Sequence, residues 1–447
     1  MGSIDTDAMT DRATAAIDDR REDIIELAES VRDEPELGFK ETKTTRKVAT
    51  AFEDLGIEVE TDLAITGVRS RIGSGELVVA VIGELDALVN PEHPRADPDT
   101  GAVHACGHHA QLANLYGTAI AFAETDIIDT FDGSIELIAV PAEEYLDLGY
   151  RKTLVDSGDL EFLGGKQELI RRGYLDDVDA ALMVHAGSET PERTITADIS
   201  SNGFVGKFVT YEGRESHAGA APDEGINALN AAMLGMNAIH TARERFRDED
   251  HVRVHPILTH GGDGVNVVPS EATMESYTRA KTVEAIEAAN DDVNRALESG
   301  AMAVGARVEI NDYPGYLPMR SDPTLVAAFE AHATDRLGDD GVSKETVHMT
   351  GSTDMGDITQ LVPGIQPFIG GFDGAVHSRE FHTVDEEMGY VIPSKLTVGT
   401  IIDVLADADR REALMAAKAE KTDVETYLKT VRTMRADVVG DYLTPES

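Results

Sequence analysis

The chain has 447 residues, and its 83 acidic side chains against 39 basic ones give a formal net charge of −44. A hydrophobic content of 41% is too high for a disordered acidic chain, and the length is sufficient for more than one domain with a buried core. The charge disfavours nucleic acid and anionic membrane surfaces as partners, because both are polyanions.

The composition also bears on where the protein works. No run of about 18 apolar residues is present, which disfavours a membrane span, and the N-terminal stretch is acidic, unlike a secretory signal. We therefore expect a cytoplasmic protein. Only 12 of the 39 basic residues are Lys. Such an acidic, Lys-poor surface is typical of a halophilic protein, and the alternative is an ordinary acidic enzyme.

The first part of the chain predicts alternating helices and strands. Helices are expected at 12–34, 41–55, 108–124 and 166–173, and strands at 77–85, 134–140 and 179–185. The strands are rich in apolar, β-branched residues, which indicates that they are buried. This order predicts an α/β domain with helices packed on a sheet.

The middle of the chain has a different pattern. Alternating strands are expected at 206–213, 252–260, 272–280 and 307–313, with helices at 227–246 and 283–302. This β-α-β-β-α-β order predicts a ferredoxin-like α+β domain at 200–312, inserted between two α/β parts, 1–199 and 313–447. The last part contains expected helices at 322–337 and 388–406, an apolar run at 361–369 and a mostly helical tail at 409–447.

The segment VHACGHHAQ places four side chains that bind metals within six positions: His104, Cys106, His108 and His109. Thiolate and imidazole are preferred ligands of zinc and similar cations. Cys106 is the only cysteine, so no intrachain disulfide exists. The segment predicts either a metal site or a histidine cluster beside a buried cysteine.

Two acidic pairs follow predicted strands. Glu84 and Asp86 lie at the end of strand 77–85, and Glu143 and Glu144 follow the strand that Pro141 ends. Asp86 would either bind a metal or orient a ligating histidine. In the second pair, one carboxylate would bind a metal and the other would transfer protons. The alternative is a strand-end carboxylate that caps a loop for the first pair, and surface charge for the second pair.

Two single histidines complete the candidate site. His185 ends the predicted strand 179–185, and His377 follows the glycine-rich segment GGFDGAVH. Either histidine alone would be a core or loop residue. Because functional groups gather at the carboxyl ends of strands in α/β sheets, we expect most of these side chains to line one cleft.

Eight motifs in this order resemble a known family: GELDAL, HACGH, PAEE, DAALMVHAG, ESHAGAAPDEGINAL, GVNVVPSEATMESYTRA, GSTDMGDITQLVPGIQPFIG and GAVHSREF. They span roughly residues 20–405. The chain resembles the aminoacylase and glutamate-carboxypeptidase family of dinuclear metal amidohydrolases. It is most similar to the branch that contains aminobenzoyl-glutamate hydrolases, auxin-conjugate amidohydrolases and small-dipeptide hydrolases.

The resemblance implies a zinc-peptidase-like catalytic domain with a mixed sheet flanked by helices. It also implies two divalent cations, zinc, manganese or cobalt, with Cys106 between them. The other implied ligands are His108, Glu144, His185 and His377. Glu143 would be the general base, and Asp86 would support a ligand without binding metal itself.

The resemblance further implies a homodimer formed through the inserted domain, which would also serve as a lid. His217, in ESHAGAAP, would reach the cleft of the neighbouring subunit and stabilise the oxyanion. Asn266 and Arg279 would hold the carboxylate of the substrate.

The sequence departs from the family pattern in three places. His109 stands where the family usually has Asp or Asn after HACGH. The segment 145–163 is longer than usual and rich in Tyr, Leu and Asp. The insertion PEHPRADPDTG, at 91–101, precedes the HACGH loop.

We therefore expect a hydrolase that cleaves the amide bond of an N-acyl amino acid, an aminobenzoyl-glutamate-like conjugate or a small dipeptide. Two other classes stay open. Cys106 could be a nucleophile paired with His108 or His104, as in a cysteine hydrolase. The protein could also bind a metal or an N-acyl amino acid without catalysis.

Overall fold

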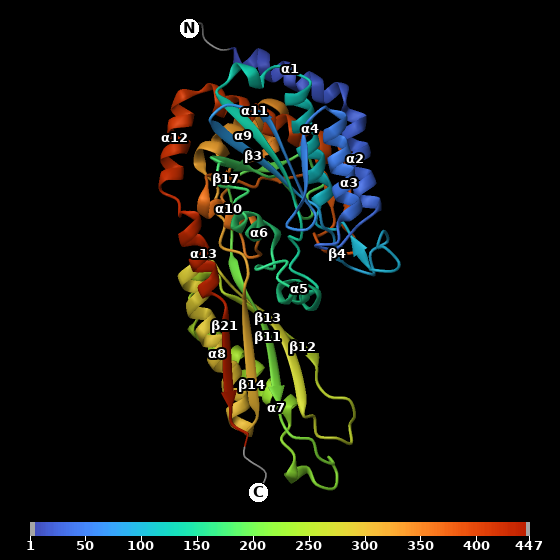
Figure 1. Cartoon of the computed structure of the whole chain (residues 1–447), viewed down its shortest axis with the longest axis vertical. Helices are drawn as coiled ribbons and strands as arrows, with labels where there is room; N and C mark the ends of the chain where they lie inside the picture. Colours follow the sequence, from blue (N-terminus) through green and yellow to red (C-terminus); the bar gives the residue numbers. More distant parts are fainter. Residues whose placement is uncertain (1–4, 444–447) are drawn as a thin grey trace. The chain divides into compact units, whose positions relative to one another are not determined.

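The structure is a computed structural model that describes residues 5–443. The chain divides into two compact units, each assembled from separate stretches of sequence. The first contains the chain up to Ser200, Arg320–His348 and Asp357–Val424, and the second contains Ser201–Met319, Met349–Gly356 and the stretch from Glu425 onward. Figure 1 shows both units coloured along the chain.

A mixed six-stranded sheet forms the centre of the first unit. Its strands, in spatial order, are β1 (Val59–Leu63), β2 (Gly67–Gly73), β6 (Gly133–Val140), β3 (Leu77–Glu84), β7 (Ala180–Leu182) and β17 (Gly364–Ile365). The four strands from β6 to β17 are parallel, whereas β1 and β2 pair antiparallel. Because the strands from β6 to β17 run in one direction, their carboxyl ends lie along one edge.

The first unit also contains several helices. They are α1 (Thr6–Asp19), α2 (Arg21–Asp33), α3 (Thr42–Asp54), α4 (His108–Ala123), α5 (Leu148–Asp156), α6 (Gly165–Arg171), α9 (Pro323–Leu337), α11 (Ile392–Ala406) and α12 (Ala408–Ala419). Helix α4 packs on β3 and is contacted by α1, α2 and α11 (Figure 1). Every residue of α4 from His108 to Phe122 is therefore buried, which explains why this helix has no polar face.

Short strands and two further helices complete the connections. One four-stranded sheet contains β15 (Val342–Ser343), β9 (Ile195–Thr196), β18 (Phe368–Ile369) and β8 (His185–Ala186). Three two-stranded sheets pair β10 (Ile199–Ser201) with β16 (Val347–Met349), β19 (Phe372–Asp373) with β20 (His382–Thr383), and β4 (Leu88–Val89) with β5 (Ala102–Val103). The further helices are α10 (Met355–Leu361) and α13 (Val424–Thr433).

The second unit contains an antiparallel five-stranded sheet with two helices on it. Its strands, in spatial order, are β12 (Arg253–His260), β13 (Glu271–Ala280), β11 (Gly203–Glu212), β14 (Arg307–Pro314) and β21 (Ala436–Asp441). Helices α7 (Ala228–Ala242) and α8 (Val283–Val304) pack on each other and on the sheet. Alternate residues of β13 are buried, as its polar alternation predicted.

The boundary between the two units differs from the expected one near the C-terminus. The tail was expected to remain helical and to belong with the last α/β part, yet β21 pairs with β14 along six residues. This pairing fills one edge of the five-stranded sheet and places the end of the chain in the second unit.

Three other local expectations were wrong. The predicted helix 12–34 is two helices, because the chain leaves helical geometry at Arg20. The predicted strand 179–185 divides into β7 and β8, which belong to different sheets. The strands β1 and β2 were not predicted, because β2 carries Arg69 and Arg71, whose guanidinium groups both bind the buried carboxylate of Glu136.

One helical stretch among the described residues, Glu387–Ala406, is long and apolar enough to cross a membrane. However, 94% of its most apolar window is buried inside the protein. It begins with a π-helical turn at Glu387–Val391 and continues as α11, which packs against α1, α4 and α9.

Candidate metal centre

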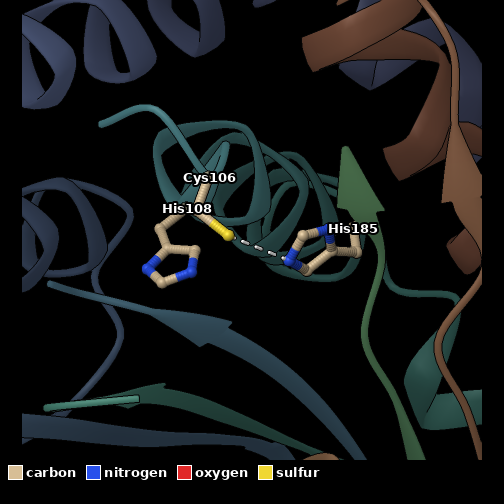
Figure 2. Close-up of side chains that lie close together, drawn as sticks. All are labelled: Cys106, His108 and His185. Atoms are coloured by element: carbon tan, nitrogen blue, oxygen red, sulfur yellow. Dashed lines mark hydrogen bonds between the residues drawn. The ribbon is translucent and has the colours of Figure 1, made fainter. Parts of the chain in front are cut away.

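The candidate ligands come from segments at the carboxyl edge of the first unit's sheet. His108 begins α4 directly after Gly107, whose φ of +91° is left-handed. A Cβ atom at position 107 would lie 2.4 Å from the Cβ of Ala186, so only glycine fits the turn. This turn brings Cys106 and His108 to the same place as His185 (Figure 2).

Two groups of potential metal ligands share the sulfur of Cys106. The first consists of Cys106, His108 and His185, and the second of Cys106, Glu144 and His377. Within each group the ligand atoms all lie within 4.8 Å of one another. Cys106 Sγ lies 3.4 Å from His185 Nε2 and 3.3 Å from His377 Nε2. All five ligands that the resemblance implied are therefore found in these two groups.

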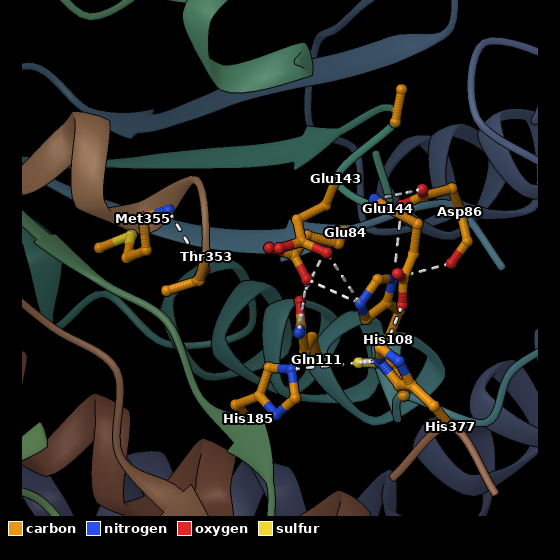
Figure 3. Close-up of polar contacts among 12 residues, drawn as sticks. Glu84, Asp86, His108, Gln111, Glu143, Glu144, His185, Thr353, Met355 and His377 are labelled. Carbon is orange, nitrogen blue, oxygen red and sulfur yellow. Dashed lines mark hydrogen bonds and ion pairs between the residues drawn. The ribbon is translucent and has the colours of Figure 1, made fainter. Parts of the chain in front are cut away.

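Asp86 holds two parts of this cluster. Its backbone carbonyl lies 2.7 Å from His108 Nδ1, and its Oδ2 accepts a hydrogen bond of 2.9 Å from the backbone N–H of Glu144 (Figure 3). Because Nδ1 donates to the carbonyl of Asp86, Nε2 is the nitrogen of His108 that faces the cluster, and it would offer its lone pair to a cation once it loses its proton. The geometry thus agrees with a supporting role for Asp86.

Glu84 forms a third group with His108 and Glu143. Its Oε2 lies 3.0 Å from His108 Nε2, and its Oε1 accepts a hydrogen bond of 2.6 Å from the buried ammonium of Lys166. Gln111 donates to the same carboxylate over 2.8 Å. Sequence reasoning named Glu84 but missed Lys166 and Gln111, since no local pattern pairs a strand end with residues 82 and 27 positions away.

The loop that carries Glu143 and Glu144 is held by a buried arginine. Arg151 is 1% exposed and donates hydrogen bonds to the backbone carbonyls of Ala142, Glu144 and Leu163. Ala142 has a φ of +57°, a left-handed conformation that is strained for alanine. The unusual segment 145–163 therefore supplies the side chain that stabilises this loop, which the sequence did not reveal.

The charges of the cluster depend on one another. Burial raises the pKa of the Cys106 thiol, but the imidazoles around it, His185 foremost, lower it to about 5. Burial lowers the pKa of His377, whereas Cys106 and Glu144 raise it to about 11. The cluster is thus a thiolate among protonated imidazoles, and a divalent cation would replace those protons.

The remaining histidines of the HACGHH segment lie apart from these groups. His104 and His109 are buried, with ring centroids 5.7 Å apart. Neither belongs to a potential metal group among the described residues. The four-ligand cluster considered from the sequence is therefore divided, and only Cys106 and His108 face the centre.

His217, Asn266 and Arg279 belong to the second unit. His217 is exposed, and its Nδ1 accepts hydrogen bonds of 3.1 Å from the backbone N–H groups of Gly219 and Ala220. The backbone carbonyl of Asn266 accepts a hydrogen bond of 3.0 Å from the N–H of Ala218, the residue after His217, so the two loops are joined. Arg279 donates to the hydroxyl of Ser352 over 2.7 Å.

Comparison with known proteins decides the family. The sequence model described as peptidase family M20/M25/M40 matches residues 80–400. The chain belongs to this peptidase family. The matched range contains every residue of the three potential metal groups. The protein is accordingly a hydrolase, and the expected family resemblance is confirmed.

Individual relatives cover most of the chain. The Xaa-Arg dipeptidase of Mus musculus is 28% identical over 389 residues, which are 83% of this chain and 82% of the relative. The N-acetylcysteine deacetylase of Bacillus subtilis (strain 168) is 28% identical over 382 residues, which are 81% of this chain and 92% of the relative.

A solved structure confirms the fold class. It is a Bacillus subtilis protein described as a dinuclear metal binding peptidase from the M20 family. It has a TM-score of 0.63 and 23% sequence identity, and the match covers 86% of this chain and 97% of that chain. The predicted α/β architecture with a mixed sheet flanked by helices is therefore correct.

Proposed function

We propose that the protein hydrolyses the amide bond of an N-acyl amino acid, an aminobenzoyl-glutamate-like conjugate or a small dipeptide, using two divalent cations of zinc, manganese or cobalt. The observation that carries this proposal is the pair of ligand groups that share the sulfur of Cys106. A thiolate has the charge and the lone pairs to contact two cations at once. The names of the relatives, a dipeptidase and a deacetylase, agree with a small amide substrate.

The bound cations would polarise the amide carbonyl and lower the pKa of a water molecule. The protein's own residues then orient and transfer protons. Glu143 Oε2 lies 3.8 Å from His108 Nε2, beside the two groups that share Cys106 but in neither of them. Its carboxylate would take a proton from the attacking water and pass it to the leaving amine.

The second unit would complete the site in a homodimer. His217 from a second copy of the chain would donate a hydrogen bond to the oxyanion that forms on the amide carbonyl. Its exposed position in a loop supports this role. The guanidinium of Arg279 and the amide of Asn266 would bind the carboxylate of the substrate.

The decisive test is the variant Glu143→Gln, assayed with a panel of N-acyl amino acids, aminobenzoyl-glutamate and dipeptides. We expect unchanged metal content by mass spectrometry and a kcat lower by about 10²–10⁴-fold, because a proton acceptor is lost. The matched change Glu58→Gln at an exposed position should leave both quantities unchanged. Full activity in Glu143→Gln would overturn the assignment of the base.

A cysteine hydrolase is the second candidate, because the Cys106 sulfur lies within 3.4 Å of an imidazole nitrogen. Removal of divalent cations by a chelator separates the two chemistries. We expect activity to disappear with the cations and to return when they are added back. An enzyme that keeps turning over without cations would instead use Cys106 as its nucleophile.

A further inference from the structure

A cavity lined by none of the candidate metal ligands lies within the first unit. Its volume is about 620 Å³, within the range of about 300–1,000 Å³ that is usual for small-molecule sites. Helix α2, the insertion 91–101, β5, the start of α4 and residues 379–383 contribute to its wall. None of the residues in the three potential metal groups lines it.

The wall of this cavity is rich in arginine. Arg32, Arg95 and Arg379 line it, whereas Glu380 is the single carboxylate among its lining residues. Such a concentration of guanidinium groups is unexpected in a chain with a net charge of −44. It makes the cavity a local site for anions.

Arg32 and Arg95 have acidic partners outside the lining, whereas Arg379 Nε lies 3.7 Å from Glu380 Oε1 within it. Asp33 accepts hydrogen bonds from Arg32 over 3.3 Å and from Arg95 over 3.0 Å, and Glu29 also binds Arg32. A guanidinium has five N–H donors. These contacts engage all three nitrogens of Arg32 but only one nitrogen of the Arg95 guanidinium, so Arg95 keeps donors for a ligand.

A buried imidazole lies in the same wall. His109 is 1% exposed, and neither of its ring nitrogens has a hydrogen-bond partner among the described residues. Its ring instead meets the edges of Tyr390 and Phe372, at centroid distances of 5.6 Å and 6.5 Å. Because both nitrogens are inaccessible to solvent, His109 contributes the face of its ring to this wall and no donor to a bound molecule.

We propose that this cavity binds a small organic carboxylate with an apolar body. A planar carboxylate matches the fork of a guanidinium and can accept two hydrogen bonds from it. Phe381 and Val103 supply apolar surface for the rest of the molecule. Two of the departures from the family pattern contribute to this wall. They are His109 and the insertion 91–101. The proposal does not depend on the proposed amide hydrolysis.

The test is a titration of the metal-loaded protein with 4-fluorobenzoate, followed by ¹⁹F NMR line widths. In the double variant Arg95→Gln and Arg379→Gln we expect the dissociation constant to rise at least about tenfold, because two charge-assisted contacts are lost. These side chains are 51% and 57% exposed, so folding does not depend on them. Arg12→Gln, at a side chain 56% exposed outside the cavity, should bind like the wild type.

Two further measurements identify the site and the ligand class. Cys106→Ala, which removes the shared ligand of the metal centre, should keep this binding. Neutral 4-fluorobenzamide should bind at least about tenfold more weakly than the carboxylate. Unchanged affinity in the double variant, loss of binding in Cys106→Ala, equal binding of the amide, or equally tight displacement by chloride or phosphate would each overturn the proposal.

Discussion

Glu41 is a carboxyl group that has no access to water. It is 0% exposed, its Oε1 accepts a hydrogen bond of 2.8 Å from the N–H of Ala142, and the hydroxyl of Thr66 lies 2.6 Å from its Oε2. Burial, together with the charge of Asp86, raises its pKa to about 8. Glu41 therefore keeps its proton at neutral pH while it supports the loop that precedes Glu143.

The raised pKa of Glu41 predicts how stability depends on pH. Between about pH 5 and 8 the folded protein holds a proton on Glu41 that the unfolded chain has lost, so the free energy of unfolding falls as pH rises. In Glu41→Gln this contribution is absent. We expect the variant to gain stability relative to the wild type as pH increases across this window.

Urea denaturation at several pH values and constant salt would measure the difference. Glu58→Gln, at an exposed position, is the control and should follow the wild type at every pH. Parallel curves for wild type and Glu41→Gln would show that Glu41 ionises normally in the folded protein.

At the level of single residues, the sequence motifs predicted the potential metal ligands better than the buried residues that hold these ligands in place. Cys106 and His108 could be named because thiolate and imidazole are ordinary metal ligands and the two residues stand together in one short segment, whereas Glu144 was named as a ligand only through the family resemblance. Arg151 and Lys166 could not be named, because a buried cation is recognisable only by the carbonyl or carboxylate that it meets after folding.

Among the elements, α7 and β12 expose apolar side chains that a water-facing surface does not require. Met233 on α7 and Ile257 on β12 are each 49% exposed. β12 and β21 are the two edge strands of the five-stranded sheet, and Ile257 lies on the β12 edge. This surface supports the proposed homodimer.

The variant Met233→Glu with Ile257→Glu tests this surface. We expect the wild type to have twice the chain mass in light scattering and the variant to be a monomer, because two buried carboxylates would oppose association. Val439→Glu, on β21 at 54% exposure, is the control and should leave the mass unchanged. A wild-type monomer at micromolar concentration would contradict the proposed dimer.

Elements with a strong local pattern were predicted almost to the residue. β3 and β6 are entirely buried and mostly apolar, so their apolar runs were unambiguous. β21 was missed because it is short and carries acidic residues, and only its pairing with β14 makes it a strand. The break between α1 and α2 was missed because Arg20 is not a helix breaker by type.

For the whole molecule, self-repulsion is the dominant consequence of the charge of −44. At about 1 M salt the Debye length is about 3 Å, so charges on the surface no longer repel each other over long distances. We expect the melting temperature to rise between dilute buffer and molar salt. Differential scanning calorimetry over a series of KCl concentrations would measure the rise.

A non-ionic solute distinguishes screening from solvent exclusion. Sucrose at matched osmolality should raise the melting temperature much less than KCl does, because it does not screen charge. A melting temperature that is flat in salt would show that the acidic surface is not an adaptation to salt.

The amino-acid sequence by itself determined the order of elements, the α/β class and the types of side chain offered for metal binding. These properties depend on local periodicity and residue chemistry, which neighbouring positions reveal. Only the tertiary structure decided that Cys106 meets His377, 271 positions away, and that among the described residues neither His104 nor His109 belongs to a potential metal group. Contacts of this kind are set by packing between distant segments, which no local pattern encodes.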